Sequence, residues 1–186
     1  REIIVRVNGL STEWGAADVK AAAGAKPHGV LFPKVNDGAD VEACEKALKD
    51  AGAPADTAIW VMIETPLAIL NIKEIAAAAK KTRLSVFVMG TNDLAKETRA
   101  VQTLARTAFI PSLTLAVLAA RAYGVIAIDG VFNDIADEAG FKTICQQALE
   151  LGFDGKTLIH PSQVDPCNTI FAPPAEEVNF AKDVIA

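Results

Sequence analysis

The sequence predicts an α/β fold with a parallel sheet, built from six consecutive β/α units. Six short apolar runs rich in branched residues begin near residues 3, 30, 59, 86, 125 and 158, and segments of helix-forming residues separate them. Because a βαβ unit takes about 30 residues or more, each interval fits one strand and one helix. Most of the runs are continuously apolar, which is typical of strands buried on both faces of a parallel sheet.

The elements follow one another in a regular order along the chain. Strands are expected at residues 3–7, 30–32, 59–63, 86–89, 125–128 and 158–159. Helices are expected at residues 39–48, 67–80, 110–123 and 140–151, where helix-forming residues present an apolar face. No low-complexity linker interrupts this order, so we expect one domain, residues 1–186.

Two architectures fit six β/α units. An open doubly wound sheet usually carries a glycine-rich phosphate-binding turn after an early strand, and the turn at residues 7–11 has a single glycine. A (β/α)₈ barrel typically has about 250 residues. This chain of 186 residues is therefore about two units short of a barrel, at roughly 30 residues a unit.

The composition excludes several classes of protein. The chain has 18 basic and 23 acidic residues, a formal charge of −5, and 51% apolar residues, which is enough for a core. The absence of a Lys/Arg cluster argues against a nucleic-acid surface. No apolar run reaches the roughly 18 residues of a membrane span, and the first residues lack the pattern of a signal peptide. Three widely spaced cysteines indicate reduced thiols, so we expect a cytoplasmic protein.

Polar side chains follow every predicted strand, and Glu64 and Asp93 are the most informative pair. They are 29 residues apart, about one β/α unit. The carboxyl ends of adjacent parallel strands lie about 5 Å apart, so the two carboxylates repel each other unless a proton or cation lies between them. A hard divalent ion such as Mg²⁺ suits this arrangement. The alternative is a pair of carboxylates bonded to the backbone or to a lysine.

Arg6 and Asp129 are candidate catalytic residues. Arg6 lies within a β-branched run, so its side chain points into a buried sheet or a barrel mouth, where its charge must be paired. Its fork fits a substrate carboxylate or carbonyl oxygen; a structural ion pair is the alternative. Asp129 follows the fifth strand, where it acts either as a base or as a carboxylate that supports the site.

Lys34 and His160 each have a functional and a structural interpretation. Lys34 follows the second strand, where it acts as a Schiff-base nucleophile or pairs with Glu64 or Asp93, and we favour pairing. His160 follows the sixth strand and precedes Pro161, so it either belongs to the site or caps the next helix.

Seven segments form a recognisable set in chain order, at residues 5–8, 32–35, 62–66, 90–95, 127–131, 152–156 and 159–163. These segments resemble the citrate lyase β-subunit family, the CoA-ester lyases within the HpcH/HpaI aldolase superfamily that include malyl-CoA and citramalyl-CoA lyases. Together they are specific for the family and not for one substrate.

The resemblance implies a (β/α)₈ barrel, often trimeric, that cleaves or forms the bond between acetyl-CoA and an oxo acid. Glu64 and Asp93 resemble the ligands of Mg²⁺, or of Mn²⁺ in its place, and Glu64 also borders the substrate. Arg6 resembles the arginine that binds the oxo-acid carbonyl or carboxylate. The strand of Asp129 lines the same mouth, and the stretch from residue 159 to residue 163 corresponds to the place where the family binds CoA, which implies CoA-binding roles for His160, Pro161 and Gln163.

The chain departs from the family pattern at both ends. Family members begin with two further β/α units, so the resemblance implies a barrel that lacks its first two units in this chain. Some related lyases also use an aspartate on a carboxyl-terminal extension. The resemblance does not extend to such a segment here, so it leaves the general acid or base unassigned.

The expected function is Mg²⁺-dependent cleavage of a 3-hydroxyacyl-CoA thioester of the malyl-, citramalyl- or citryl-CoA type to acetyl-CoA and an oxo acid, or the reverse condensation. The expected partners are the CoA thioester, the oxo acid and further copies of the chain in a homotrimer. The alternatives are a malyl-CoA-type thioester hydrolase, a class II pyruvate-type aldolase and a non-catalytic fragment or subunit.

Overall fold

The computed structural model describes residues 2–185, which include a parallel sheet of six strands. The strands are β1 (Ile4–Arg6), β2 (Gly29–Phe32), β3 (Ala58–Ile63), β4 (Leu84–Met89), β5 (Ile126–Asp129) and β6 (Gly155–Lys156). They lie in the sheet in the order in which they follow one another in the chain, and each neighbouring pair is parallel. A doubly wound sheet reverses its order at a switch point, so that alternative is excluded, and the curled sheet forms half a barrel.

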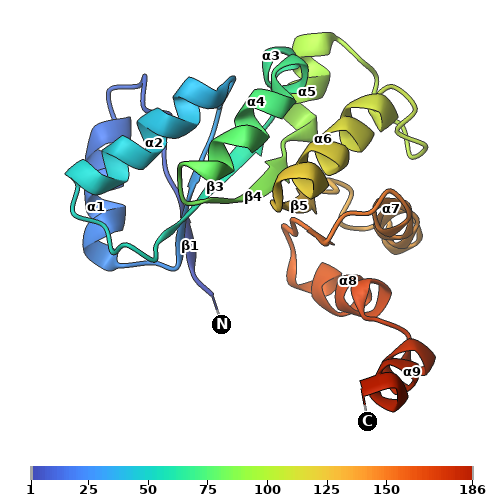
Figure 1. The fold of residues 1–186 in the computed structure, drawn as a ribbon. Coiled ribbons are helices and arrows are strands. Elements are labelled where there is room, and N and C mark those ends of the chain that lie inside the picture. Colours follow the sequence, from blue (N-terminus) through green and yellow to red (C-terminus); the bar gives the residue numbers. More distant parts are fainter. Residues whose placement is uncertain (1, 186) are drawn as a thin grey trace.

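Helices connect the strands and pack along the sheet (Figure 1). They are α1 (Gly15–Ala25), α2 (Gly38–Asp50), α3 (Pro66–Leu70), α4 (Ile72–Ala77), α5 (Thr91–Thr98), α6 (Ile110–Tyr123), α7 (Glu138–Glu150), α8 (Val164–Phe171) and α9 (Ala175–Ile185), with short 3₁₀ helices at Ala78–Lys80 and Pro161–Gln163. Figure 1 shows α9 extending away from the sheet, and none of its described residues is buried. Within residues 2–185, no helix has the length and apolarity needed to cross a bilayer.

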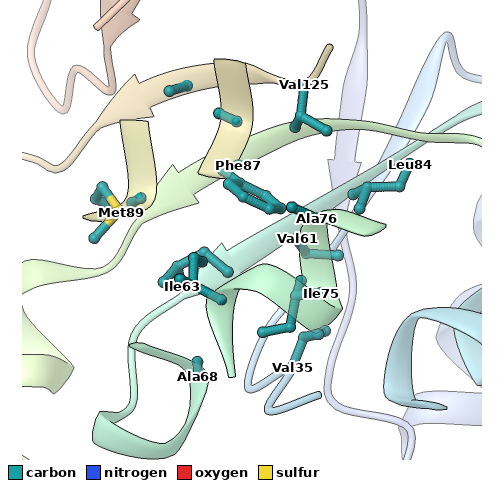
Figure 2. Close-up of a cluster of buried hydrophobic side chains, with 14 of the residues drawn as sticks. Val35, Val61, Ile63, Ala68, Ile75, Ala76, Leu84, Phe87, Met89 and Val125 are labelled. Atoms are coloured by element: carbon teal, nitrogen blue, oxygen red, sulfur yellow. The ribbon is translucent and has the colours of Figure 1, made fainter. Parts of the chain in front are cut away.

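The apolar core lies between one face of the sheet and the helices. Figure 2 shows Val61 and Ile63 of β3 and Phe87 of β4 in one cluster with Ile75 and Ala76 of α4. All five side chains are fully buried. This burial explains the apolar runs from which the strands were predicted.

The other face of the sheet is covered less. Leu31 and Trp60 are register partners of Arg6 and therefore share its face. Both side chains are half-buried, and Ile126 on the same face is 46% exposed. The prediction that the strands are buried on both faces is wrong for these residues, because the core helices pack against the opposite face.

Most predicted elements are confirmed within two or three residues. The helix predicted at residues 110–123 is α6, which begins and ends at those residues. The helix predicted at residues 67–80 is broken at Asn71 into α3 and α4, followed by a 3₁₀ turn.

The sixth strand lies earlier than predicted. It consists of Gly155 and Lys156, whereas Leu158 and Ile159 belong to the following loop. The apolar pattern missed this strand because the strand contains Lys156. This lysine is the register partner of Asp129, and its ammonium contacts the Asp129 carboxylate.

Candidate active site

Glu64 directly follows β3 and is completely buried. Its Oε1 accepts a hydrogen bond of 2.9 Å from the backbone N–H of Lys34. Its Oε2 has no hydrogen-bond partner in the described part of the chain, although it is also buried. Burial raises the pKa of this carboxyl, and the nearby Asp93 raises it further.

Gly90 makes room for the Glu64 side chain. A Cβ atom at this position would collide with Glu64, including its Oε2 at 2.8 Å. Gly90 lies between β4 and α5, so the helix that carries Asp93 begins directly beside Glu64. The close approach of these two elements therefore requires glycine at this point.

Lys34 connects the carboxylates of this region. Its backbone is left-handed, with φ of 55°, a conformation that a non-glycine residue adopts rarely. Its N–H donates to Glu64, and its Nζ lies 3.1 Å from Asp93 Oδ1 and 3.2 Å from Glu97 Oε1. The favoured interpretation of Lys34 as a pairing partner is therefore confirmed.

Asp93 lies in the first turn of α5 and its side chain is 44% exposed. Partial burial would raise the pKa of Asp93, but the ammonium of Lys34 outweighs it and holds the pKa below its usual value. Burial would lower the pKa of Lys34, yet Asp93 and Glu97 keep it above its usual value. Glu64 and Asp93 lie close enough to shift each other's pKa.

The carboxylate pair, Glu64 and Asp93, fits a divalent metal ion. Glu64 Oε2 is a buried acceptor with no donor among residues 2–185, and a proton or a cation would balance the charge of this carboxylate. Among residues 2–185 there is no group of three or more side chains that suits a metal ion. Mg²⁺ needs no such group, because it is usually bound by one or two carboxylates and keeps waters or substrate oxygens.

Arg6 is the last residue of β1 and is exposed. It forms no ion pair with any residue from 2 to 185. The expectation that its charge is paired is thus wrong, because the guanidinium reaches water at the less covered face of the sheet. The structure does not bring Arg6 into contact with the carboxylate pair.

Asp129 lies at the end of β5 and is completely buried in a cluster of charges. Both of its oxygens lie 2.8 Å from Nη1 of Arg106, and Oδ2 also lies 2.8 Å from Nζ of Lys156. Gln147 binds Nε of Arg106 at 2.7 Å. Two cations therefore satisfy Asp129, which favours the supporting role over the base.

The sequence did not single out Arg106 or Lys156 as site residues. Arg106 lies in an irregular stretch between α5 and α6, and Lys156 lies inside a strand of two residues. The Gly-Lys pair at residues 155–156, two residues before the predicted sixth strand, is the local signal that could have found Lys156, because a lysine buried in a sheet requires an anion beside it.

The three residues with implied CoA-binding roles lie after β6. His160 and Pro161 are exposed, and His160 Nδ1 accepts the N–H of Ser162 at 3.2 Å. His160 thus caps the 3₁₀ helix, as its structural interpretation predicted. Gln163 is buried and bonds to backbone atoms, accepting from Ile159 N at 3.0 Å and donating to Phe132 O at 3.1 Å.

A cavity of about 360 Å³ borders the start of α5. Its apolar wall includes Phe109 and Phe132, and its polar wall includes Arg106 and Asn133. Asn133 and Asn92 exchange two amide hydrogen bonds, of 2.8 and 3.1 Å. Neither member of the carboxylate pair lines this cavity.

Known proteins resemble this chain over nearly its whole length. It is 47% identical over 183 residues to the (3S)-malyl-CoA thioesterase of Cereibacter sphaeroides, covering 98% of this chain and 61% of that protein. It is 35% identical over 189 residues to citrate lyase subunit beta of Escherichia coli, covering 99% of this chain and 62% of that subunit. The chain thus spans about three fifths of the length of these relatives.

A solved structure with a similar fold contains ligands. The CitE protein of Mycobacterium tuberculosis in complex with magnesium, acetoacetate and coenzyme A matches with a TM-score of 0.76 and 27% identity, over 98% of this chain and 65% of that one. The family model described as HpcH/HpaI aldolase/citrate lyase matches residues 1–161. This chain therefore belongs to the HpcH/HpaI aldolase/citrate lyase family.

Proposed function

We propose that this chain carries the metal-binding part of a Mg²⁺-dependent enzyme that acts on CoA thioesters of the malyl-CoA type. The observation that carries the proposal is the buried Oε2 of Glu64, which lies near Asp93 and has no hydrogen-bond partner within residues 2–185. The two carboxylates would bind Mg²⁺ or Mn²⁺, and Glu64 would also border the substrate. The M. tuberculosis structure, with magnesium, acetoacetate and coenzyme A, supports this ligand set.

The metal ion, when bound, supplies a Lewis acid for the substrate oxygens. Arg6 would bind the oxo-acid carboxylate or carbonyl oxygen, because its guanidinium is exposed and has no partner among residues 2–185. Asp129 would keep Arg106 and Lys156 in place. The loop with His160, Pro161 and Gln163 would border the CoA. Gln163 stabilises this loop, because its side chain bonds to the backbone of both Phe132 and Ile159.

Two reactions start from the same bound thioester. Carbon–carbon cleavage yields acetyl-CoA and an oxo acid, and hydrolysis yields free CoA and a hydroxy acid. Lyase activity is supported by the 35% identity to citrate lyase subunit beta. Hydrolysis is the second candidate, and the 47% identity to a malyl-CoA thioesterase favours it.

The site requires a closed barrel in this proposal. Two further β/α units would pair with the edge strands β1 and β6 and cover the half-buried face that carries Arg6 and Trp60. A homotrimer stays a prediction. The three cysteines are free and buried, which supports the expectation of a reducing, cytoplasmic compartment.

An assay of the intact protein with malyl-, citramalyl- and citryl-CoA tests the proposal. Acetyl-CoA and free CoA are measured separately, with Mg²⁺ or with EDTA. We expect Mg²⁺-dependent release of one of the two, and we expect Glu64→Gln and Asp93→Asn to abolish it. Glu42→Gln, which removes an exposed carboxylate on α2, serves as the control.

Arg6→Lys gives a further check on the arginine. This variant keeps the positive charge, yet it should lower activity markedly, because the planar guanidinium fork is lost.

Metal-independent turnover, or full activity of either Glu64→Gln or Asp93→Asn, would overturn the metal assignment.

A further inference from the structure

Lys34 already binds a carboxylate that the proposed metal ion would use. Its ammonium lies 3.1 Å from Asp93, one of the two proposed metal ligands. An ammonium and a divalent cation on the same carboxylate repel each other, so the two compete for Asp93. In this inference, Lys34 leaves Asp93 when the carboxylate pair binds a metal ion.

The backbone of Lys34 limits where the ammonium can go. The N–H of Lys34 is bound to Glu64 Oε1 at 2.9 Å, and φ is 55°. The main chain at Lys34 is thus tied to the site while its side chain moves. The carboxylate that holds Nζ after it leaves Asp93 must lie within reach of this anchored backbone.

Glu97 is that partner. It follows Asp93 by four residues on α5, so the two side chains lie on the same face of the helix, one turn apart. Its Oε1 is already 3.2 Å from Lys34 Nζ, and its side chain is 41% exposed. Glu97 does not form a metal-binding group of three with Glu64 and Asp93.

We propose that Glu97 is a positioning residue, which takes over the Lys34 ammonium from Asp93 when a divalent cation binds to Glu64 and Asp93. This inference rests on the proposed metal site and adds a residue that acts through Lys34. Without Glu97 the ammonium keeps its bond to Asp93 and competes with the metal ion. Glu97→Gln should therefore weaken metal binding, even though Glu97 is not itself a ligand.

Titration of the intact protein with MnCl₂, followed by EPR without substrate, tests the inference. Glu97→Gln should raise the Kd for Mn²⁺ roughly tenfold, at the lower end of the effect of residues that support metal ligands. The control Glu42→Gln removes the same charge from α2 and should leave Kd unchanged. Circular dichroism checks that each variant is folded.

A double-mutant cycle separates this mechanism from simple attraction between Glu97 and the metal ion. In a Lys34→Met background, Glu97→Gln should change Kd by no more than about twofold, the scatter of independent sites. An effect that persists in this background, or no effect in the wild-type background, would overturn the role of Glu97. A wild-type protein that binds no Mn²⁺ would overturn the metal site itself, and with it this inference.

Discussion

At the scale of single residues, charge balance distinguishes two carboxylates that resemble each other in the sequence. Glu64 and Asp129 both follow an apolar run and both are completely buried. Asp129 is neutralised by Arg106 and Lys156, whereas the described part of the chain gives Glu64 one backbone donor and leaves its Oε2 without a partner. A buried charge without a partner is costly, so Glu64 is the better candidate for binding a ligand.

Asp129→Asn should destabilise the protein by about 3–5 kcal/mol, because it leaves two buried cations without their counter-ion. Glu64→Gln should be close to neutral or stabilising, since it removes a buried charge that accepts one hydrogen bond from residues 2–185. Urea unfolding of both variants measures the difference. Loss of activity in Asp129→Asn with unchanged unfolding would instead support the role of a base.

At the scale of elements, short segments carry the site. Asp93 and Glu97 lie on α5, a helix of eight residues that the sequence did not predict. Its apolar face is small, since Leu94 and Ala95 are its buried apolar residues. Tertiary contacts outweigh local propensity for helices of this length, which explains why α6 was predicted and α5 was not.

Glu45 joins α2 to the start of β4, because it accepts from Arg83 N at 3.0 Å and from Arg83 Nε at 3.1 Å. Burial alone would raise the pKa of Glu45, but Arg83 and Lys49 outweigh it, and the pKa lies below its ordinary value of 4.5. The carboxylate therefore adds stability that is present above 4.5 and is lost as the pH falls through the lowered pKa.

Glu45→Gln should consequently destabilise the protein at neutral pH, and its difference from wild type should shrink as the pH falls below 4.5. Urea unfolding over this pH range measures the effect. Glu42→Gln on the same helix, where the carboxylate has no ion pair among residues 2–185, should show no such trend. If the two proteins differed in free energy of unfolding by the same amount at all pH values, the negative charge of Glu45 would not be the source of the stabilisation.

At the scale of the whole molecule, the sheet is buried on one face and half-covered on the other. Its edge strands β1 and β6 each have one neighbour. Exposed strand edges and apolar patches are unfavourable in a soluble protein. Closure by two further β/α units would resolve both features together and would give Arg6 a barrel mouth to line.

Trp60 reports on this closure, since its side chain lies on the half-covered face. Replacing the exposed Trp14 by Phe leaves Trp60 as the sole tryptophan. Its emission should be blue-shifted, and less quenched by acrylamide, in a chain with two additional amino-terminal units than in the folded chain of 186 residues. Equal quenching in the two chains would contradict the closed barrel.

The sequence by itself determined the repeating β/α units and the proximity of Glu64 to Asp93. Both follow from local rules, because apolar runs mark buried strands and the carboxyl ends of parallel strands meet at one edge. It also placed Lys34 beside these carboxylates.

Only the tertiary structure decided which face each side chain occupies. Arg6 and Asp129 both end strands, yet Arg6 reaches water and Asp129 is enclosed by Arg106 and Lys156. Side chains alternate between the faces of a strand, so a shift of one residue in register reverses their environment. The partners of Asp129 come from a distant loop and strand, and they meet it only when the chain folds.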